Sequence, residues 1–234
     1  MRCELSGVAG WHKTSLIDFP GTVSTVLFFS GCNLRCPYCH NPHVVNAQAA
    51  DEIDSSAIWS FLEKRRNVID GIVLSGGEPT LHACCASAAA GMRELGFRVK
   101  LDTNGLLPDM IGKIAPEYLA LDIKTSPRLY KTYCKSPYED IEERLVRSLA
   151  IVKTMGANAE VRITCAPEVV SREIISELVP LIAGVSQVFL QPMQNTVPLL
   201  DPAFADKPLI PPQEIEQFRE ILAPHVGRCD IRGS

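Results

Sequence analysis

The sequence lacks the features that mark membrane-spanning, secreted and nucleic-acid-binding proteins. No apolar run is long enough to cross a bilayer. Residues 1–10 lack the charged start and apolar stretch that are typical of a signal peptide. With 23 Lys and Arg against 27 Asp and Glu, the net charge of −4 leaves no basic excess to attract nucleic acid or anionic membranes. We therefore expect a cytoplasmic protein that binds neither nucleic acid nor membrane.

We also expect no framework of disulfide bonds. The chain has nine cysteines, an odd number, and no secretory signal accompanies them. Three of the nine, Cys32, Cys36 and Cys39, fall within eight residues. We expect the others to be small buried side chains: Cys3, Cys84, Cys85, Cys134, Cys165 and Cys229.

The 234 residues, 46% hydrophobic and 21% charged, have the composition of one globular domain over residues 1–234. Apolar runs rich in β-branched residues alternate with helical patterns about six times. The expected strands are residues 23–30, 71–74, 97–101, 118–123, 160–164, 187–190 and a short 226–231. The expected helices are residues 54–66, 81–95, 109–114, 141–155, 171–182 and 211–222. This alternation predicts an α/β fold, in which a parallel sheet, open or curled into a partial barrel, is covered by helices.

Polar segments follow the expected strands. In parallel α/β sheets, ligands bind at the carboxyl ends of the strands, so we expect these segments to line one mouth. They are residues 31–39, 75–79, 102–105, 122–124, 162–164 and 191–194. The Pro-rich stretch from Pro192 to Pro212 is interpreted as a surface loop within the same domain.

The cysteine-rich segment predicts a thiolate metal site. Thiolates are soft ligands that select zinc, copper(I) or iron–sulfur clusters. A four-iron cluster normally takes four cysteines, and with no fourth cysteine nearby one iron would stay open to a substrate. A Cys3His zinc site with His40 or His43 is the alternative, but zinc sites usually come as two spaced pairs and no second pair follows. An electron-transfer ferredoxin would need a fourth cysteine.

The spacing Cys-x3-Cys-x2-Cys, with Tyr38 before the third cysteine, resembles the signature of radical S-adenosylmethionine (SAM) enzymes. Within them, segments 16–21 (LIDFPG) and 31–42 (GCNLRCPYCHNP) look like those of glycyl-radical-enzyme activating proteins. The likeness is greatest to activators of anaerobic ribonucleoside-triphosphate reductase, and pyruvate formate-lyase activating enzymes are similar.

This resemblance implies a partial (β/α)6 barrel of parallel strands with outer helices, the radical SAM fold. It also implies a 4Fe-4S cluster on Cys32, Cys36 and Cys39 that cleaves SAM reductively. The resulting radical would take a hydrogen atom from a glycine of a partner enzyme, here anaerobic ribonucleotide reductase. A low-potential donor such as flavodoxin or ferredoxin would supply the electron.

Segment 75–79 (SGGEP) is the first part of the expected SAM site. Gly76 and Gly77 let the backbone approach a ligand closely, and Glu78 can accept a hydrogen bond from an ammonium group. By resemblance, this motif, through Pro79, binds the methionine amino group of SAM. An ordinary strand-to-helix turn is the alternative.

Two further strand ends carry charged candidates. Strand alternation puts Asp122 and Lys124 on one side, and by resemblance Lys124 pairs with the SAM carboxylate, although a salt bridge is the alternative. The resemblance also gives SAM contacts to Asp102, Thr103 and Asn104, and a monovalent cation to Asp102 and Asp122.

Three other residues complete the candidate set. Arg162, in an otherwise apolar strand, needs an anionic partner, either a ligand carboxylate or a structural ion pair. By resemblance Tyr38 contacts adenine, and Gln191 at the last strand end either flanks it or packs in a loop. Two other functions stay open: a radical SAM enzyme acting on a small molecule such as a modified purine precursor, and a non-enzymatic zinc or iron–sulfur module.

Overall fold

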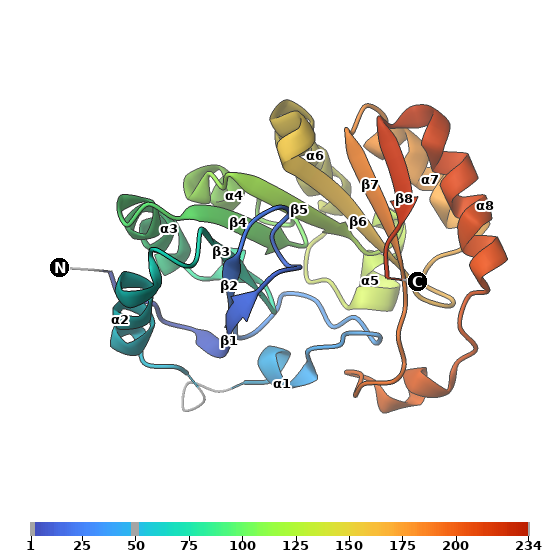
Figure 1. Ribbon diagram of the computed structural model, residues 1–234. Helices are drawn as coiled ribbons and strands as arrows, with labels where there is room; N and C mark the ends of the chain where they lie inside the picture. The colour runs from blue at the N-terminus through green and yellow to red at the C-terminus, as the bar shows by residue number, and fades with distance from the viewer. Residues whose placement is uncertain (1–2, 48–51, 234) are drawn as a thin grey trace. The chain divides into compact units, whose positions relative to one another are not determined.

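The computed structural model describes residues 3–47 and 52–233, and they form an α/β structure (Figure 1). Among the described residues, eight strands, β1 to β8, neighbour one another in the same order as in the chain. By its internal contacts the chain divides into two compact units. The first unit comprises Met1–Cys32, His43–Thr103 and Asp109–Leu119, and the second comprises Asn33–Pro42, Asn104–Pro108 and Ala120–Ser234. The expectation of a single domain over residues 1–234 stays a prediction.

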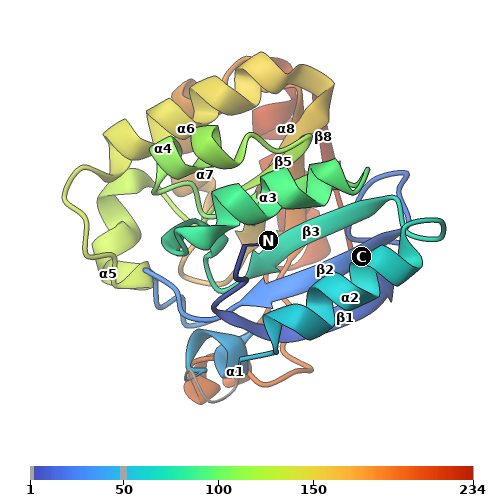
Figure 2. The same cartoon turned by 90° about the vertical axis from the view of Figure 1, so that its left-hand side faces the viewer.

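The first unit is built on β1 (Val8–Ser15), β2 (Ser24–Phe29), β3 (Gly71–Gly76) and β4 (Arg98–Thr103). β1 is antiparallel to β2, whereas the pairs β2–β3 and β3–β4 are parallel. Its helices are α1 (Pro42–Val45), α2 (Ser55–Arg65), α3 (Cys84–Glu94) and α4 (Pro108–Ile114), with a one-turn 3-10 helix at Pro79–Leu81. Figure 2 shows α2 and α3 lying along β2 and β3. The Asp54 side chain caps α2 by accepting from Ser56 N.

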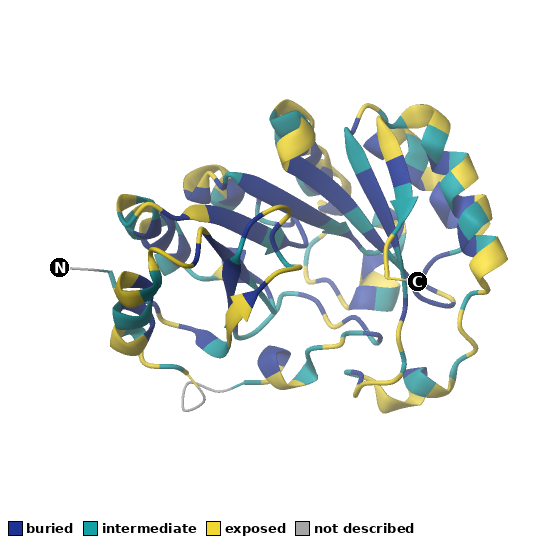
Figure 3. Cartoon of the chain, viewed as in Figure 1, coloured by how far each residue is buried: buried dark blue, intermediate teal, exposed yellow. Residues whose placement is uncertain are grey.

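The second unit begins within β5 (Tyr118–Ile123) and continues with β6 (Ala159–Cys165), β7 (Gln187–Pro192) and β8 (Arg228–Ile231). The pairs β6–β7 and β7–β8 are parallel. The helices are α5 (Tyr130–Cys134), α6 (Ile141–Met155), α7 (Arg172–Ile182) and α8 (Pro212–Leu222). Single 3-10 turns lie at Pro127–Leu129, Gly156–Asn158, Pro202–Asp206 and Ala223–His225. Figure 3 shows β6 and β7 largely buried and α7 and α8 buried along one stripe, as helices that cover a sheet require.

The segment Leu16–Gly21 between β1 and β2 is anchored by its aromatic residue. Phe19 is fully buried and packs in a cluster with Val26, Val73 and Tyr118. The neighbouring Leu16 and Ile17 are 74% and 90% exposed. The first unit therefore exposes two large apolar side chains to solvent, next to the buried Phe19.

The predicted α/β class and the parallel sheet are confirmed, and every expected strand and helix is present within a few residues of its expected bounds. Strand β1 and the short helices α1 and α5 were not expected. The sequence of β1 lacks the alternating pattern of a strand, because three consecutive residues, His12, Lys13 and Thr14, are exposed at its irregular end. Among the described residues no helix is long and apolar enough to span a membrane.

Candidate active site

In the first unit, the loop after β3 lies tightly against the end of β2. Gly77 N donates to Phe29 O (2.8 Å) and Glu78 N donates to Gly31 O (2.9 Å). A Cβ atom on Gly77 would overlap the Gly31 carbonyl oxygen and lie 2.7 Å from its carbon. Gly76 has φ +110°, a conformation that side chains disfavour. The two glycines are therefore required by backbone packing, in addition to any approach by a ligand.

Glu78 is fully buried and fixed by two threonines. Its Oε1 accepts from Thr80 N (3.1 Å), Thr80 Oγ1 (2.5 Å) and Thr103 Oγ1 (2.7 Å). These bonds tie the end of β3 to the end of β4. Thr103, expected to contact SAM, thus orients Glu78, and Thr80 is a positioning residue that the sequence did not single out.

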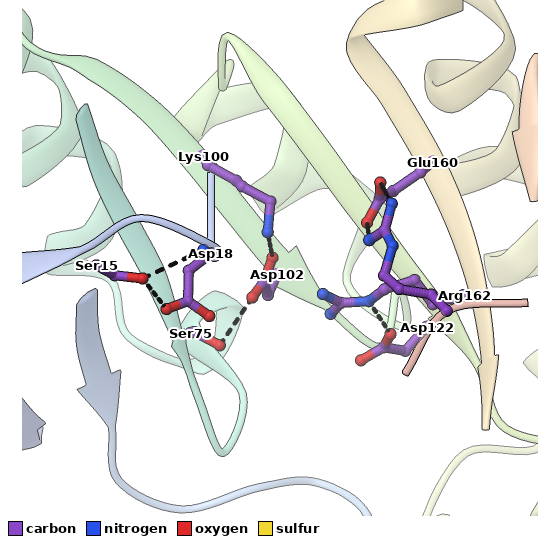
Figure 4. Close-up of polar contacts among 9 residues, drawn as sticks. Ser15, Asp18, Ser75, Lys100, Asp102, Asp122, Glu160 and Arg162 are labelled. Atoms are coloured by element: carbon purple, nitrogen blue, oxygen red, sulfur yellow. Dashed lines mark hydrogen bonds and ion pairs between the residues drawn. The ribbon is translucent and has the colours of Figure 1, made fainter. Parts of the chain in front are cut away.

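Asp102, at the end of β4, is ion-paired within the first unit (Figure 4). Lys100 Nζ lies 2.5 Å from Asp102 Oδ1, and Ser75 Oγ donates to Oδ2 at 3.0 Å. Lys100 is 3% exposed, so its ammonium depends on this carboxylate for neutralisation. The cation site expected between Asp102 and Asp122 stays a prediction, and in this structure each carboxylate already binds a basic side chain.

In the second unit, backbone hydrogen bonds from distant segments hold the cysteine loop. Cys39 N donates to Cys36 O at 3.1 Å, which closes a tight turn between two expected ligands. Asp201 N donates to Pro37 O and Leu200 N donates to Cys39 O, both at 3.0 Å. From the other side, Arg35 N donates to the carbonyl of Cys134, the last residue of α5, at 2.7 Å.

The thiols of Cys36 and Cys39 lie in a buried setting. A hydrogen bond to the Cys134 thiol, together with burial, raises the pKa of Cys36 well above its ordinary value. Burial also raises the pKa of Cys39, and the charge of Cys36 adds to this effect. Lys124 acts in the opposite direction on both thiols, so a cation lies close to them. Soft sulfur donors beside an ammonium group suit a thiolate-bound cluster, whose net charge is negative.

Cys32 belongs to the first unit, whereas Cys36 and Cys39 belong to the second. Among the described residues no group of three His, Cys, Asp or Glu side chains is preformed as a metal site. The three-cysteine cluster site therefore stays a prediction, supported by the loop geometry of Cys36 and Cys39.

Asp122 on β5 is the centre of a charged group in the second unit (Figure 4). Arg162 Nε lies 2.6 Å from its Oδ1, and Lys124 Nζ lies 3.1 Å from its Oδ2. Burial raises the pKa of Asp122, but the facing charges of Arg162 and Lys124 outweigh it and leave the pKa below its ordinary range. Burial lowers the pKa of Lys124, and the Asp122 charge more than offsets this. Both basic residues are thus paired with Asp122 and stay charged near the cysteine loop, and their expected contacts with a SAM carboxylate stay predictions.

Of the remaining candidates, Asn104 has a clear structural contact. Its Nδ2 donates to Asn33 Oδ1 at 2.7 Å, and its Oδ1 accepts from Leu106 N at 3.1 Å. Asn104 thereby holds the start of the cysteine loop. Tyr38 is 4% exposed with its ring 6.3 Å from that of Phe204, and Gln191 on β7 is half-buried opposite Thr164. Their expected adenine contacts stay predictions.

The sequence also missed Cys134 as a functional neighbour. It is buried, as expected of it, but its thiol contacts Cys36 and its carbonyl contacts Arg35. No local pattern could reveal this, because α5 is far from the cysteine loop in the chain.

Comparisons with known proteins agree with the motifs. Residues 26–176 match the model of the Radical SAM superfamily. A Methanocaldococcus jannaschii protein named as a candidate glycyl-radical enzyme activating enzyme is 29% identical, with 96% of this chain and 95% of that protein covered. A 7-carboxy-7-deazaguanine synthase of Hyperthermus butylicus is 34% identical over 38% of each chain. The crystal structure of QueE from Escherichia coli, 15% identical, superposes with a TM-score of 0.60 over 97% of this chain and 93% of its own, and so shares the fold.

Proposed function

The chain belongs to the radical SAM superfamily, and on that basis we propose that it is a glycyl-radical-enzyme activating enzyme. The observation that carries the proposal is the relative from M. jannaschii, which matches almost from end to end and is named for this activity. We take the partner to be anaerobic ribonucleotide reductase, and the electron donor to be a flavodoxin or ferredoxin. When bound, a 4Fe-4S cluster and SAM supply the reductive cleavage that generates the hydrogen-abstracting radical.

The three cysteines have the ligand role in this proposal. Cys36 and Cys39 reach the cluster from a loop fixed by hydrogen bonds to residues 134, 200 and 201. Cys32 contributes from the segment after β2. Lys124 stabilises the thiolate form, because its charge opposes the effects that raise the pKa of Cys36 and Cys39.

The first unit would bind the methionine amino group of SAM. Glu78 presents a carboxylate whose orientation is set by Thr80 and Thr103, so little rotamer freedom is lost when an ammonium group binds. Gly76, Gly77 and Pro79 shape the loop around it.

The second unit would bind the SAM carboxylate and adenine. Lys124 and Arg162 are held in place by Asp122, which leaves two cations on one side of β5 and β6 for a carboxylate. Asn104, Tyr38 and Gln191 are proposed contacts around the nucleoside, and Asp102 a further contact on the first unit.

The small-molecule alternative is favoured by matches to 7-carboxy-7-deazaguanine synthases of several organisms. The synthase of Thermococcus kodakarensis is 26% identical and covers 71% of this chain and 72% of its own, whereas the activating-enzyme relative is 29% identical and covers 96% and 95%. We therefore rank the activating function first.

The test is anaerobic reconstitution with iron and sulfide, followed by reduction with SAM and a candidate glycyl radical enzyme. We expect about four irons per chain, 5′-deoxyadenosine formation and a glycyl radical EPR signal on the partner. Cys36→Ala should lose the cluster and the cleavage. Cys165→Ala, a buried cysteine of the same unit outside the loop, is the matched control and should keep both.

The outcomes separate the alternatives. Cleavage of SAM without a glycyl radical on any candidate partner, together with turnover of a purine precursor, would replace this proposal by the small-molecule one. Absence of both iron binding and cleavage after careful reconstitution would refute radical chemistry altogether.

A further inference from the structure

We propose that the ammonium group of Lys100 takes the place of a bound monovalent cation at Asp102, so that this chain binds SAM without K⁺ or Na⁺. The resemblance to activating proteins implies such a cation on Asp102 and Asp122, whereas the structure gives Asp102 a cation of its own. The inference rests on the proposed function for its SAM-binding step, but the ion pair itself can be tested without SAM.

Lys100 and Asp102 form an ion pair within one strand. They stand two residues apart on β4, and strand alternation puts their side chains on the same face. Lys100 Nζ lies 2.5 Å from Asp102 Oδ1, and the two side chains are 3% and 13% exposed. Ser75 Oγ donates to the other oxygen, Oδ2, at 3.0 Å (Figure 4). Both carboxylate oxygens of Asp102 are therefore bonded within the first unit.

Burial fixes the ammonium group of Lys100 at this place. A buried charge is tolerated when an opposite charge neutralises it, and removal of either partner strands the other. Tyr118 adds a second attraction, because Lys100 Nζ lies 6.0 Å from the centroid of its buried ring, a distance at which an aromatic face attracts a cation. A carboxylate and an aromatic ring thus hold the same ammonium group.

A free cation would compete poorly for Asp102. If it bound beside Lys100, two positive charges would lie next to one carboxylate and repel each other at low dielectric constant. If it displaced Lys100, a buried ammonium group would lose its counter-ion. The free ion also loses translational freedom on binding, whereas Lys100 is tethered two residues away and has already lost this freedom on folding.

In the second unit, the other carboxylate of the expected cation site is also neutralised by basic side chains. Asp122 Oδ1 lies 2.6 Å from Arg162 Nε, and its Oδ2 lies 3.1 Å from Lys124 Nζ. This group has two positive charges and one negative charge, so it lacks the excess negative charge that would attract a metal cation. At both carboxylates the chain itself supplies the positive charge.

The first test measures SAM binding by the reconstituted chain before reduction. Dissociation constants are compared in KCl, NaCl and choline chloride at the same ionic strength, because choline is too bulky to replace K⁺ or Na⁺ among side chains. The wild type should bind SAM with the same affinity in the three salts. An affinity that K⁺ or Na⁺ raises more than about twofold over choline would overturn the proposal.

The second test needs no SAM and removes the ammonium group while Asp102 stays in place. Lys100→Met should lower the free energy of unfolding in urea when the salt is choline chloride. KCl should restore part of this loss with a saturable dependence on concentration, because K⁺ can then bind Asp102. Lys113→Met, a change at an exposed lysine of α4 in the same unit, is the matched control and should respond to the salts as the wild type does.

The same variant connects the ion pair to the ligand. In choline chloride, Lys100→Met should bind SAM about tenfold more weakly than the wild type, and KCl should recover most of the affinity. The double variant Lys100→Met with Asp102→Asn has no carboxylate for an ion to bind, so its unfolding free energy should be the same in KCl and choline chloride. This comparison separates ion binding from a general effect of salt.

The outcomes distinguish this inference from the proposed function. A chain that binds no SAM in any salt contradicts the proposed function, and the unfolding measurements then decide the role of Lys100. A folded Lys100→Met that gains no response to K⁺, or a double variant that keeps the response, would overturn the inference. If Lys100→Met does not fold, the wild type decides, because K⁺ bound at Asp102 would stabilise it relative to choline and we expect no such stabilisation.

Discussion

Replacement of Asp122 by asparagine removes the carboxylate that neutralises two cations in the second unit. Asp122 lies 2.6 Å from Arg162 Nε and 3.1 Å from Lys124 Nζ, and the three side chains are 15–24% exposed. Removal of one partner from a buried ion pair costs about 3–5 kcal/mol, because the other charge is stranded. Since these side chains retain some contact with water, we expect a loss of about 2–3 kcal/mol in unfolding free energy at pH 7.

Urea unfolding of the anaerobically purified chain, followed by circular dichroism, measures this loss. Glu177→Gln in the same unit is the control: the pair Arg128–Glu177 is 62% and 37% exposed, and because water screens it, its loss should cost far less stability than that of Asp122. The double variant Asp122→Asn with Arg162→Met removes one stranded charge and should recover part of the loss. A cost for Asp122→Asn no greater than that of Glu177→Gln would refute the reasoning.

The same carboxylate predicts the pH dependence of stability. Burial raises the pKa of Asp122, but Arg162 and Lys124 leave it below the ordinary value of about 3.9. The unfolded chain therefore takes up this proton first as the pH falls. The stabilisation is complete above about pH 5, starts to decline as the pH approaches the unfolded pKa of about 3.9, and is lost once the pH has fallen through the folded pKa. The difference between wild type and Asp122→Asn should stay constant down to about pH 5, and an earlier decline would contradict the assigned shift.

Two further changes test the loop after β3 and the exposed apolar segment. Gly77→Ala places a Cβ against the Gly31 carbonyl and should lower the unfolding free energy, measured with urea, by about 3 kcal/mol. Gly112→Ala within α4 is the control, because a Cβ there meets nothing, and it should raise the unfolding free energy by about 0.5–1 kcal/mol. Equal effects of the two changes would exclude the close approach of Gly77 and Gly31 as the cause. Leu16→Ser and Ile17→Ser remove side chains that are 74% and 90% exposed. Under the proposed function these changes should raise the KM for the partner about tenfold, or about 1.4 kcal/mol. The free energy of unfolding should change by less than about 0.5 kcal/mol. An unchanged KM would show that the partner binds elsewhere.

Much of the fold was predictable because parallel strands are buried on both faces. Ile72, Val73 and Leu74 of β3, and the apolar run of β5, produce continuous apolar segments that are recognisable without any neighbour. β1 escaped prediction because an antiparallel edge strand needs only one buried face, and its end is solvated.

The candidate site could be predicted where several of its residues follow one another closely in the sequence. The cysteine loop and the segment 75–79 each carry several candidate residues within a short stretch. Thr80 and Cys134 were not predicted as site neighbours, because each acts through a contact with one residue, Glu78 or Cys36. No sequence motif marks such a contact. Arg162 was noticed because a charge in an apolar strand demands a partner, but only the structure identifies Asp122 as that partner.

The order in which the cysteine loop acquires its supports has a consequence for biosynthesis. The loop backbone is bonded to Cys134, Leu200 and Asp201, all of which leave the ribosome long after Cys36 and Cys39. A nascent chain that has just exposed its thiols therefore lacks every one of these bonds. We expect iron to be loaded onto the finished polypeptide, and a chain stalled before residue 200 to present its cysteines without the scaffold that spaces them.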